Sequence, residues 1–435
     1  MARAGATATA GSTGSRPHPT DMRPTRRPFG LLLLIAAIAG ACVRALTAPG
    51  PGDYPWDAGP ALTAIAHGSL SGFFSHQPAM GAVALYTRVP FVLLGAAFHD
   101  SRLGLYRWGA LPCLLAVALL ATWLARVAAR RGTGHAGQVL IVAICLLNPL
   151  VSDALYWGHP EELLAASLAV GALLAASEGR LTSAAVLTGL AVATKQWALL
   201  VVCPVLLTCE RRRLRRALAM SATAGAATLP MLVANLGAFR HTLLYISKPQ
   251  PFTSVFDWLY PLAPSGRVSA ALPFGDLRTY TGHTLPQWAG VVSHPLIIAL
   301  GVIVPLAVWL RCGRRLATPE LFLSAALVFL LRCTLDPGSA RYYHLPLLMA
   351  LVAFDTTTGA ALPVAGLAAC AGAFAILDRL PSYVSNELGS LLYIAATLTA
   401  AALLAHRLFS GSEHSLEGAP APTRRRWLRV YGTDL

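Results

Sequence analysis

Charged side chains are scarce in this sequence of 435 residues. Asp, Glu, Lys and Arg make up 12% of the chain, whereas a soluble domain carries about 25%. Hydrophobic residues make up 55% and gather in repeated long runs. The shortage of charge excludes an ordinary soluble protein, and the runs predict an all-α, polytopic membrane protein with about 12 transmembrane helices.

Lysine is almost missing. Lys195 and Lys248 are the only lysines, so nearly all of the positive charge behind the net +15 comes from Arg. The arginines lie in short bursts between apolar runs, such as "RVAARRG" and "ERRRLRR". A nucleic-acid-binding protein would gather its charge on one folded basic face, so we expect no nucleic-acid partner. Bursts of this kind are typical of the cytoplasmic loops of proteins that span a lipid bilayer.

The motifs of common catalytic and metal sites are also missing. None of the eight cysteines forms a CxxC pair or a Cys/His cluster, so we expect neither a disulfide framework nor a zinc site. The sequence contains no phosphate loop, GxSxG elbow or HExxH motif. No pair of carboxylates demands a metal ion, so we expect no metal and no other cofactor.

The arginine bursts orient the apolar runs. Residues 1–28 predict a disordered basic cytoplasmic tail, residues 29–409 a membrane domain, and residues 410–435 a basic cytoplasmic tail. About 12 crossings with both termini inside place every burst on the cytoplasmic side. This arrangement requires that "QPAMGAVALYTRVPFVLLGAAF", which contains Arg88, lies at the outer interface or re-enters the membrane instead of crossing it.

Two long segments, near residues 48–102 and 240–293, then lie on the extracytoplasmic side. Long loops inside a compact fold are usually functional or disordered, and the Trp, Tyr, Pro and Asp residues of these two segments indicate order. Most of the informative polar residues fall on the same side. Ionisable groups at membrane depth are costly, so they indicate a functional site.

Asp53 and Asp57 follow the first apolar run, in "GDYPWDAGPALTAIAHG". A carboxylate at the boundary between water and lipid suits a general base that takes a proton from a sugar hydroxyl. Two structural alternatives stay open. Asp53 can begin the turn in "PGPGDYP", and Asp57 can cap the helix that follows it.

The stretch "GHPEELL" begins a later apolar run with His159, Pro160, Glu161 and Glu162. Proline in the first turn and carboxylates at the positive end of the helix dipole explain Pro160 and both Glu without chemistry. They do not explain His159, so a substrate-facing role for His159 or Glu161 stays open. Because the two Glu are adjacent, we expect their side chains to point in different directions.

Lys195 lies between two apolar runs and precedes Gln196. It can be a helix-end lysine that reaches the interface, but Arg fills that position elsewhere in the chain, and a compact ammonium suits a phosphate. Arg341, followed by Tyr342 and Tyr343, is a second phosphate candidate because a guanidinium contacts a phosphate at two points. The tyrosines alone would be ordinary interfacial anchors.

Four stretches, in this order, resemble the GT-C superfamily of polytopic glycosyltransferases: "WDAGPALTAIAHG", "LLNPLVSDALYWGHPEE", "TGLAVATKQWALLVVCPVLL" and "ARYYHLPLL". The chain looks closest to the bacterial polyprenyl-phosphomannose-dependent mannosyltransferases of glycosyltransferase family 87 and their actinobacterial relatives. The resemblance covers about Leu31 to Met349. Many relatives have Gln at the position of His159 and Pro at the position of Gln196.

The resemblance implies an inverting transfer of a sugar, mannose first, from a polyprenyl-phosphate donor to a glycolipid or polysaccharide acceptor at the outer face of the cell membrane. Asp57 is then the base, with Asp53 in reserve, and Lys195 and Arg341 hold the donor phosphate. The full set of expected substrate-binding residues is His159, Glu161, Lys195, Gln196, Lys248, Arg341, Tyr342 and Tyr343. Two alternatives stay open: a transporter or flippase of lipid-linked sugars, which would need polar residues through the midplane, and a non-catalytic binder of such lipids.

Overall fold

The computed structural model describes residues 27–50, 52–78, 80–98, 101–209, 211–247, 252–271, 277–314 and 316–410. Both predicted terminal tails, apart from their innermost residues, lie outside this part of the chain. Helices account for most of the described residues. The prediction of an all-α polytopic fold is therefore confirmed.

Eight helical segments among the described residues are long and apolar enough to cross a membrane. They comprise α1 (Arg27–Leu46), α6 (Arg102–Arg130), α7 with α8 (His135–Leu147 and Pro149–Trp157), α12 (Arg213–Ala234), α14 (Gln287–Arg311), α15 (Thr318–Leu335), α17 with η5 and η6 (Val364–Gly372, Ala373–Arg379 and Leu380–Ser382) and α18 (Asn386–Ser410). Each coincides with one of the predicted crossings.

The four other predicted crossings are helical but shorter. They comprise α9 (Glu161–Ser177), α10 (Leu181–Val192), η2 with α11 (Gln196–Val201 and Val202–Leu207) and η4 with α16 (Arg341–His344 and Leu345–Thr358). A helix of 12 residues such as α10 spans about 18 Å, less than the apolar thickness of a bilayer. Short helices are tolerated at membrane depth where protein rather than lipid surrounds them.

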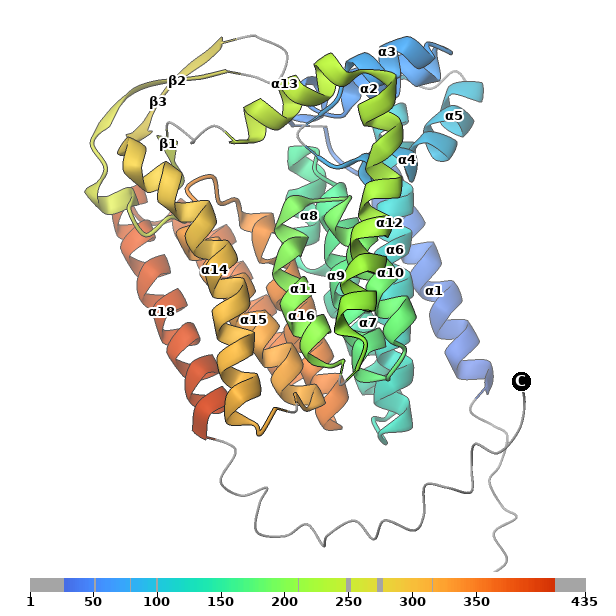
Figure 1. Ribbon diagram of the computed structural model, residues 1–435, viewed down its shortest axis with the longest axis vertical. Helices are drawn as coiled ribbons and strands as arrows, with labels where there is room; N and C mark the ends of the chain where they lie inside the picture. Colours follow the sequence, from blue (N-terminus) through green and yellow to red (C-terminus); the bar gives the residue numbers. More distant parts are fainter. Residues whose placement is uncertain are drawn as a thin grey trace, which may run out of the picture.

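Both long segments that the sequence places outside gather at one end of the helix bundle (Figure 1). The first contains the short helices α2 (Gly59–Ala66), α3 (Leu70–Ser75), α4 (Ala82–Tyr86) and α5 (Val89–Ala97), and the second contains α13 (Leu236–Ser247). The start of α1 and the end of α18 lie at the opposite end. The segment around Arg88 forms two short helices, α4 and α5, and the expectation that it does not cross the membrane stays a prediction.

A small antiparallel sheet, which the sequence analysis did not predict, follows α13 (Figure 1). Its strands are β1 (Phe252–Thr253), β2 (Ser265–Ala271) and β3 (Leu277–Thr284), in the order β1-β3-β2, and η3 (Tyr260–Leu262) lies between the first two. The sheet lies beside the end of the bundle.

Helix α9 lies at the centre of the bundle, where it contacts α6, α10 and α16. Nearly all of its residues are buried, and a helix that is apolar on every side is typical of a protein core. Its first turn places Glu161 and Glu162 inside the protein, with exposed fractions of 0% and 1%. Two carboxylates that are buried away from water require cationic partners. These partners define the candidate site.

Candidate functional site

Two segments that are distant in sequence meet where α8 ends. The amide of Asp53 donates a hydrogen bond to the carbonyl of Trp157, at 2.8 Å. Gly158 ends α8 in the left-handed conformation, with φ of +84°, and a Cβ there would lie 2.7 Å from the backbone nitrogen of Tyr54. Only glycine satisfies both requirements. The contact brings the two predicted aspartates, which flank η1 (Tyr54–Trp56), beside the residue that follows Gly158.

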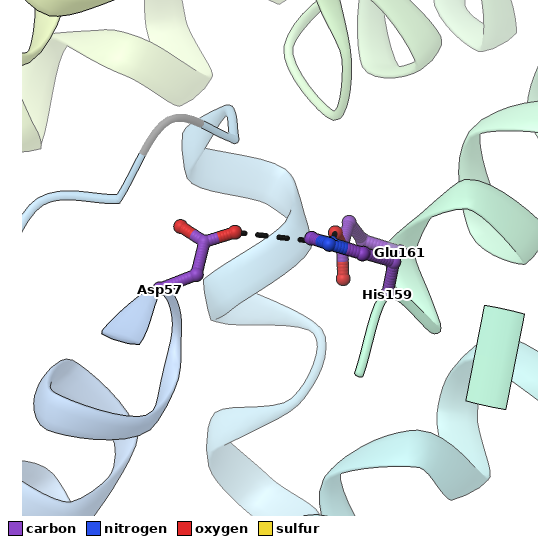
Figure 2. Close-up of side chains that lie close together, drawn as sticks. All are labelled: Asp57, His159 and Glu161. Carbon is purple, nitrogen blue, oxygen red and sulfur yellow. Dashed lines mark hydrogen bonds and ion pairs between the residues drawn. The ribbon is translucent and has the colours of Figure 1, made fainter. Parts of the chain in front are cut away.

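That residue, His159, has three carboxylates around its ring, and Figure 2 shows two of them. Nδ1 lies 2.9 Å from Oε1 of Glu161 and 3.9 Å from Oδ2 of Asp57, while Nε2 lies 3.5 Å from Oδ2 of Asp53. Burial of the ring opposes its positive charge, but the hydrogen bonds to Asp53 and Glu161 outweigh burial and raise the pKa of His159 to about 10. At neutral pH His159 is therefore a cation, and its positive charge faces all three carboxylates.

The side chains of Glu161 and Glu162 converge on one cation, so the prediction that they point in different directions is wrong. Nζ of Lys195 lies 3.2 Å from Oε1 of Glu161 and 3.3 Å from Oε1 of Glu162. Lys195 lies in the turn between α10 and η2, and its side chain extends to the first turn of α9. There the side chains of Glu161 and Glu162 contact the same ammonium group beyond the helix end. Glu162 also accepts a hydrogen bond of 2.8 Å from the indole of Trp197.

Arg88 belongs to the same cluster, although the sequence analysis gave it no role in the site. It is fully buried, its Nη1 lies 3.6 Å from Oε2 of Glu161, and its guanidinium lies 5.5 Å from the ring centre of Tyr54. The sequence did mark Arg88, because it is a single Arg within an apolar run and lies away from the arginine bursts. A charge buried in this way is costly without a partner, so a buried carboxylate was to be expected nearby.

Aromatic rings form one wall of the cluster. The ring of Tyr342 lies 5.2 Å from the ring of His159, and the ring of Tyr343 lies 4.2 Å from the guanidinium of Arg332. Arg332, near the end of α15, also lies 5.0 Å from the ring of Trp197. The sequence analysis missed Arg332, and its signal is the one seen for Arg88: a single Arg within an apolar run.

The cluster alternates positive and negative side chains. Four carboxylates face four cations, namely Asp53, Asp57, Glu161 and Glu162 with Arg88, His159, Lys195 and Arg332. Five of these eight residues, Asp57, Arg88, Glu161, Glu162 and Arg332, have exposed fractions below 9%, so their pairing determines whether the core is stable.

Of three other predicted substrate-binding residues, one pairs outside this cluster, one is exposed next to Lys195, and one lies outside the described residues. Arg341 is part of η4 but pairs with Asp378, at 3.7 Å from Nη1 to Oδ1. Gln196 is exposed at the start of η2. Lys248 lies outside the described residues.

Asp57, His159 and Glu161 are also the residues that could hold a metal ion. Each offers one ligand atom, and these atoms lie within 4.8 Å of one another (Figure 2). Lys195 and Arg88 already contact Glu161, so a divalent ion would add positive charge beside two existing cations. The expectation that no metal is needed stays a prediction.

Comparison with known proteins identifies the family of the chain. No curated protein matches the chain. The sequence model of glycosyltransferase family 87 matches residues 82–337, which is more than half of the chain. The match includes His159, Glu161 and Lys195, while both aspartates lie before it and Tyr342 lies after it. The chain is therefore a membrane-embedded glycosyltransferase and belongs to glycosyltransferase family 87.

Proposed function

We propose that this glycosyltransferase moves a sugar, mannose first, from a polyprenyl-phosphate donor to a glycolipid or polysaccharide acceptor, with inversion, at the outer face of the cell membrane. The observation that carries the proposal is the position of Asp57. Asp57 is buried and its carboxylate faces the cationic ring of His159. It lies between η1 and α2, and α2 is at the end of the bundle where both long segments gather (Figure 1).

Asp57 is proposed as the general base. An inverting transfer needs a carboxylate that removes the proton of the acceptor hydroxyl while the sugar leaves its phosphate on the opposite face. The cationic ring of His159, 3.9 Å from Asp57, favours the ionised carboxylate, which is the form that can accept a proton. Asp53, with its side chain 45% exposed, faces the other ring nitrogen and supports the charge of His159.

The leaving phosphate needs positive charge, because its negative charge grows as the bond to the sugar breaks. Lys195 and Arg332 are the proposed sources of that charge, held in place by Glu162 and by two aromatic rings respectively. The face of Tyr342, beside His159, suits the apolar face of a sugar ring. A fixed arrangement of this kind stabilises charge without reorganisation during the reaction.

Removal of metal ions is expected to leave transfer unchanged, because Lys195, Arg88 and His159 already supply the positive charge around Glu161. The rate of sugar transfer should be measured before and after treatment of the purified protein with EDTA. A rate that falls at least tenfold and returns with Mg²⁺ or Mn²⁺ would show that Asp57, His159 and Glu161 hold an ion.

The proposed donor can be tested directly. Membranes that contain the full-length protein should be incubated with radiolabelled polyprenyl-phosphate mannose, and in parallel with the arabinose and glucose counterparts. We expect label from the mannose donor to appear in a glycolipid or polysaccharide. Transfer from a nucleotide sugar alone would contradict the donor class, and movement of intact lipid-linked sugar across the membrane without transfer would contradict the reaction.

A further inference from the structure

Three exposed aromatic side chains lie in the segments that carry Asp57 and His159. Trp56 immediately precedes Asp57 in the chain, and Tyr156 and Trp157 are the last two residues of α8. Their exposed fractions are 44%, 55% and 43% respectively. We call these three residues the aromatic patch. Rings of this size bury a large apolar area when a ligand or lipid covers them, so their exposure beside a charged cluster indicates a surface for contact.

Backbone contacts hold the two parts of the aromatic patch together. The amide of Gly52 donates a hydrogen bond of 2.9 Å to the carbonyl of Tyr156, next to the bond from Asp53 to Trp157. A Cβ on Gly52 would lie 2.7 Å from Cα of Trp157, so only glycine allows this approach. The amide of Trp56 in turn donates a hydrogen bond of 2.9 Å to the carbonyl of Asp53. This bond keeps Trp56 within one turn of the junction with α8.

Neighbouring groups also orient the rings at the end of α8. The ring centres of Tyr156 and Trp157 lie 5.5 Å apart with an interplanar angle of 89°, which is a favourable edge-to-face arrangement. The carboxylate of Asp153 interacts with the side chain of Trp157 and with the backbone of Tyr342, whose ring packs against His159. A ring that is already held in place loses little freedom when a ligand packs against it.

The side of the cluster that adjoins the aromatic patch is acidic. Asp53 and Asp57 face the ring of His159 there, whereas the proposed phosphate ligands Lys195 and Arg332 face the first turn of α9. Carboxylates repel a phosphate through their like charge, but they accept hydrogen bonds from sugar hydroxyls. The aromatic patch therefore suits a neutral sugar better than the phosphate of the proposed donor.

The proposed reaction requires the acceptor on this same side. Asp57 can take the proton only if the acceptor hydroxyl comes within about 3 Å of its carboxylate. The sugar that carries this hydroxyl then lies against the segment that contains Trp56, and the rest of the acceptor extends over the exposed surface nearby. One face of a pyranose ring presents mainly C–H groups, which pack favourably on the electron-rich face of an aromatic ring.

We propose that the aromatic patch binds a neutral sugar ring of the acceptor through the exposed faces of Trp56 and Trp157. The inference rests on the proposed function, because it assigns a surface to the acceptor of the proposed transfer. Tyr156 supports the ring of Trp157 through their edge-to-face contact. The aromatic patch thus determines how tightly the acceptor binds and contributes nothing to binding of the donor.

Trp288 provides a matched control. It is 59% exposed in the first turn of α14 and belongs to neither of the joined segments. Trp56→Ala, Trp157→Ala and Trp288→Ala each remove one exposed indole, while Trp56→Phe and Trp157→Phe retain a flat aromatic face. Each full-length protein should be placed in lipid nanodiscs and titrated with methyl α-mannobioside, and in parallel with the methyl glycosides of maltose and cellobiose. Saturation-transfer NMR of the sugar protons measures Kd.

We expect at least one of these neutral disaccharides to bind the wild type, with a Kd about tenfold higher in Trp56→Ala and in Trp157→Ala. The two Phe variants and Trp288→Ala should stay within about threefold of the wild type, because they keep an aromatic face at the patch. Equal Kd values in all variants would identify the rings as interfacial membrane anchors and overturn the proposal. Failure of the wild type to bind any of the three sugars would overturn it as well.

Kinetics with the proposed donor separates acceptor binding from the reaction. With polyprenyl-phosphate mannose as donor, both Ala variants should raise KM for the bound disaccharide about tenfold, while KM for the donor stays at the wild-type value. A rise in KM for the donor alone would assign the rings to the donor and overturn the proposal. Wild-type protein that binds a disaccharide but transfers sugar to no acceptor would instead contradict the proposed function, with the aromatic patch still a sugar-binding surface.

Discussion

Replacing Asp57 by Asn is expected to lower the rate of sugar transfer by about 10²- to 10⁴-fold, which is the usual contribution of a positioned general base. The amide has nearly the same size as the carboxylate but cannot take the proton of the acceptor hydroxyl. His159 keeps its 2.9 Å contact with Glu161 and its contact with Asp53, so the rest of the cluster stays in place. The loss should appear in kcat, measured with labelled donor, while KM changes little.

Asp53→Asn is the matched control, because it removes a carboxylate from the other nitrogen of the same ring. We expect its rate to stay within about tenfold of the wild type, since Asp53 would only support the charge of His159. The thermal unfolding midpoint of both variants in detergent should match that of the wild type. A larger loss in Asp53→Asn than in Asp57→Asn would make Asp53 the base, and full activity in both would contradict base catalysis by either aspartate.

The parts of the fold that could be predicted from the sequence are those that contact with lipid or water determines. Long apolar runs predicted the long helices of the described part of the chain, and the run that contains Arg88 forms two short helices there. The lengths of α9, α10 and α16 were harder to predict, because the surrounding protein sets how far a buried helix extends. The sheet β1-β3-β2 was missed because "SGRVSAA" and "LRTYTGHT" show no clear alternation of apolar and polar residues.

The candidate site was predictable wherever one residue carried its own signal. His159, Lys195 and Asp57 each stood out as polar groups beside apolar runs, and the structure brings them together. Their partners were not visible, because an ion pair such as Arg88 with Glu161 joins residues that are distant in sequence and depends on the tertiary fold, not on any local pattern. Arg341 was predicted with Tyr342 from adjacency in sequence, yet the turn of η4 directs Arg341 to Asp378 and Tyr342 to His159.

Glu161→Gln is expected to be the most destabilising single change in the cluster, with a loss of about 3–5 kcal/mol in the free energy of unfolding. Glu161 contacts three cations, Arg88, His159 and Lys195. After the change Lys195 keeps Glu162, but within the described part of the chain Arg88 has no other carboxylate within 4.0 Å. The cost arises from leaving that guanidinium buried and unpaired. Chemical unfolding of the full chain in detergent would measure it.

Two further variants decide whether charge pairing is the cause. Glu178 also pairs with two arginines, Arg130 and Arg180, but both arginine side chains are more than half exposed, so Glu178→Gln should cost less than about 1 kcal/mol. The double variant of Glu161→Gln with Arg88→Met should recover most of the lost stability, because replacing a buried pair by uncharged groups is often nearly neutral. If the double variant is less stable than Glu161→Gln alone, Arg88 stabilises the fold through its packing, and the pair with Glu161 is not what holds the first outer segment to the central helix.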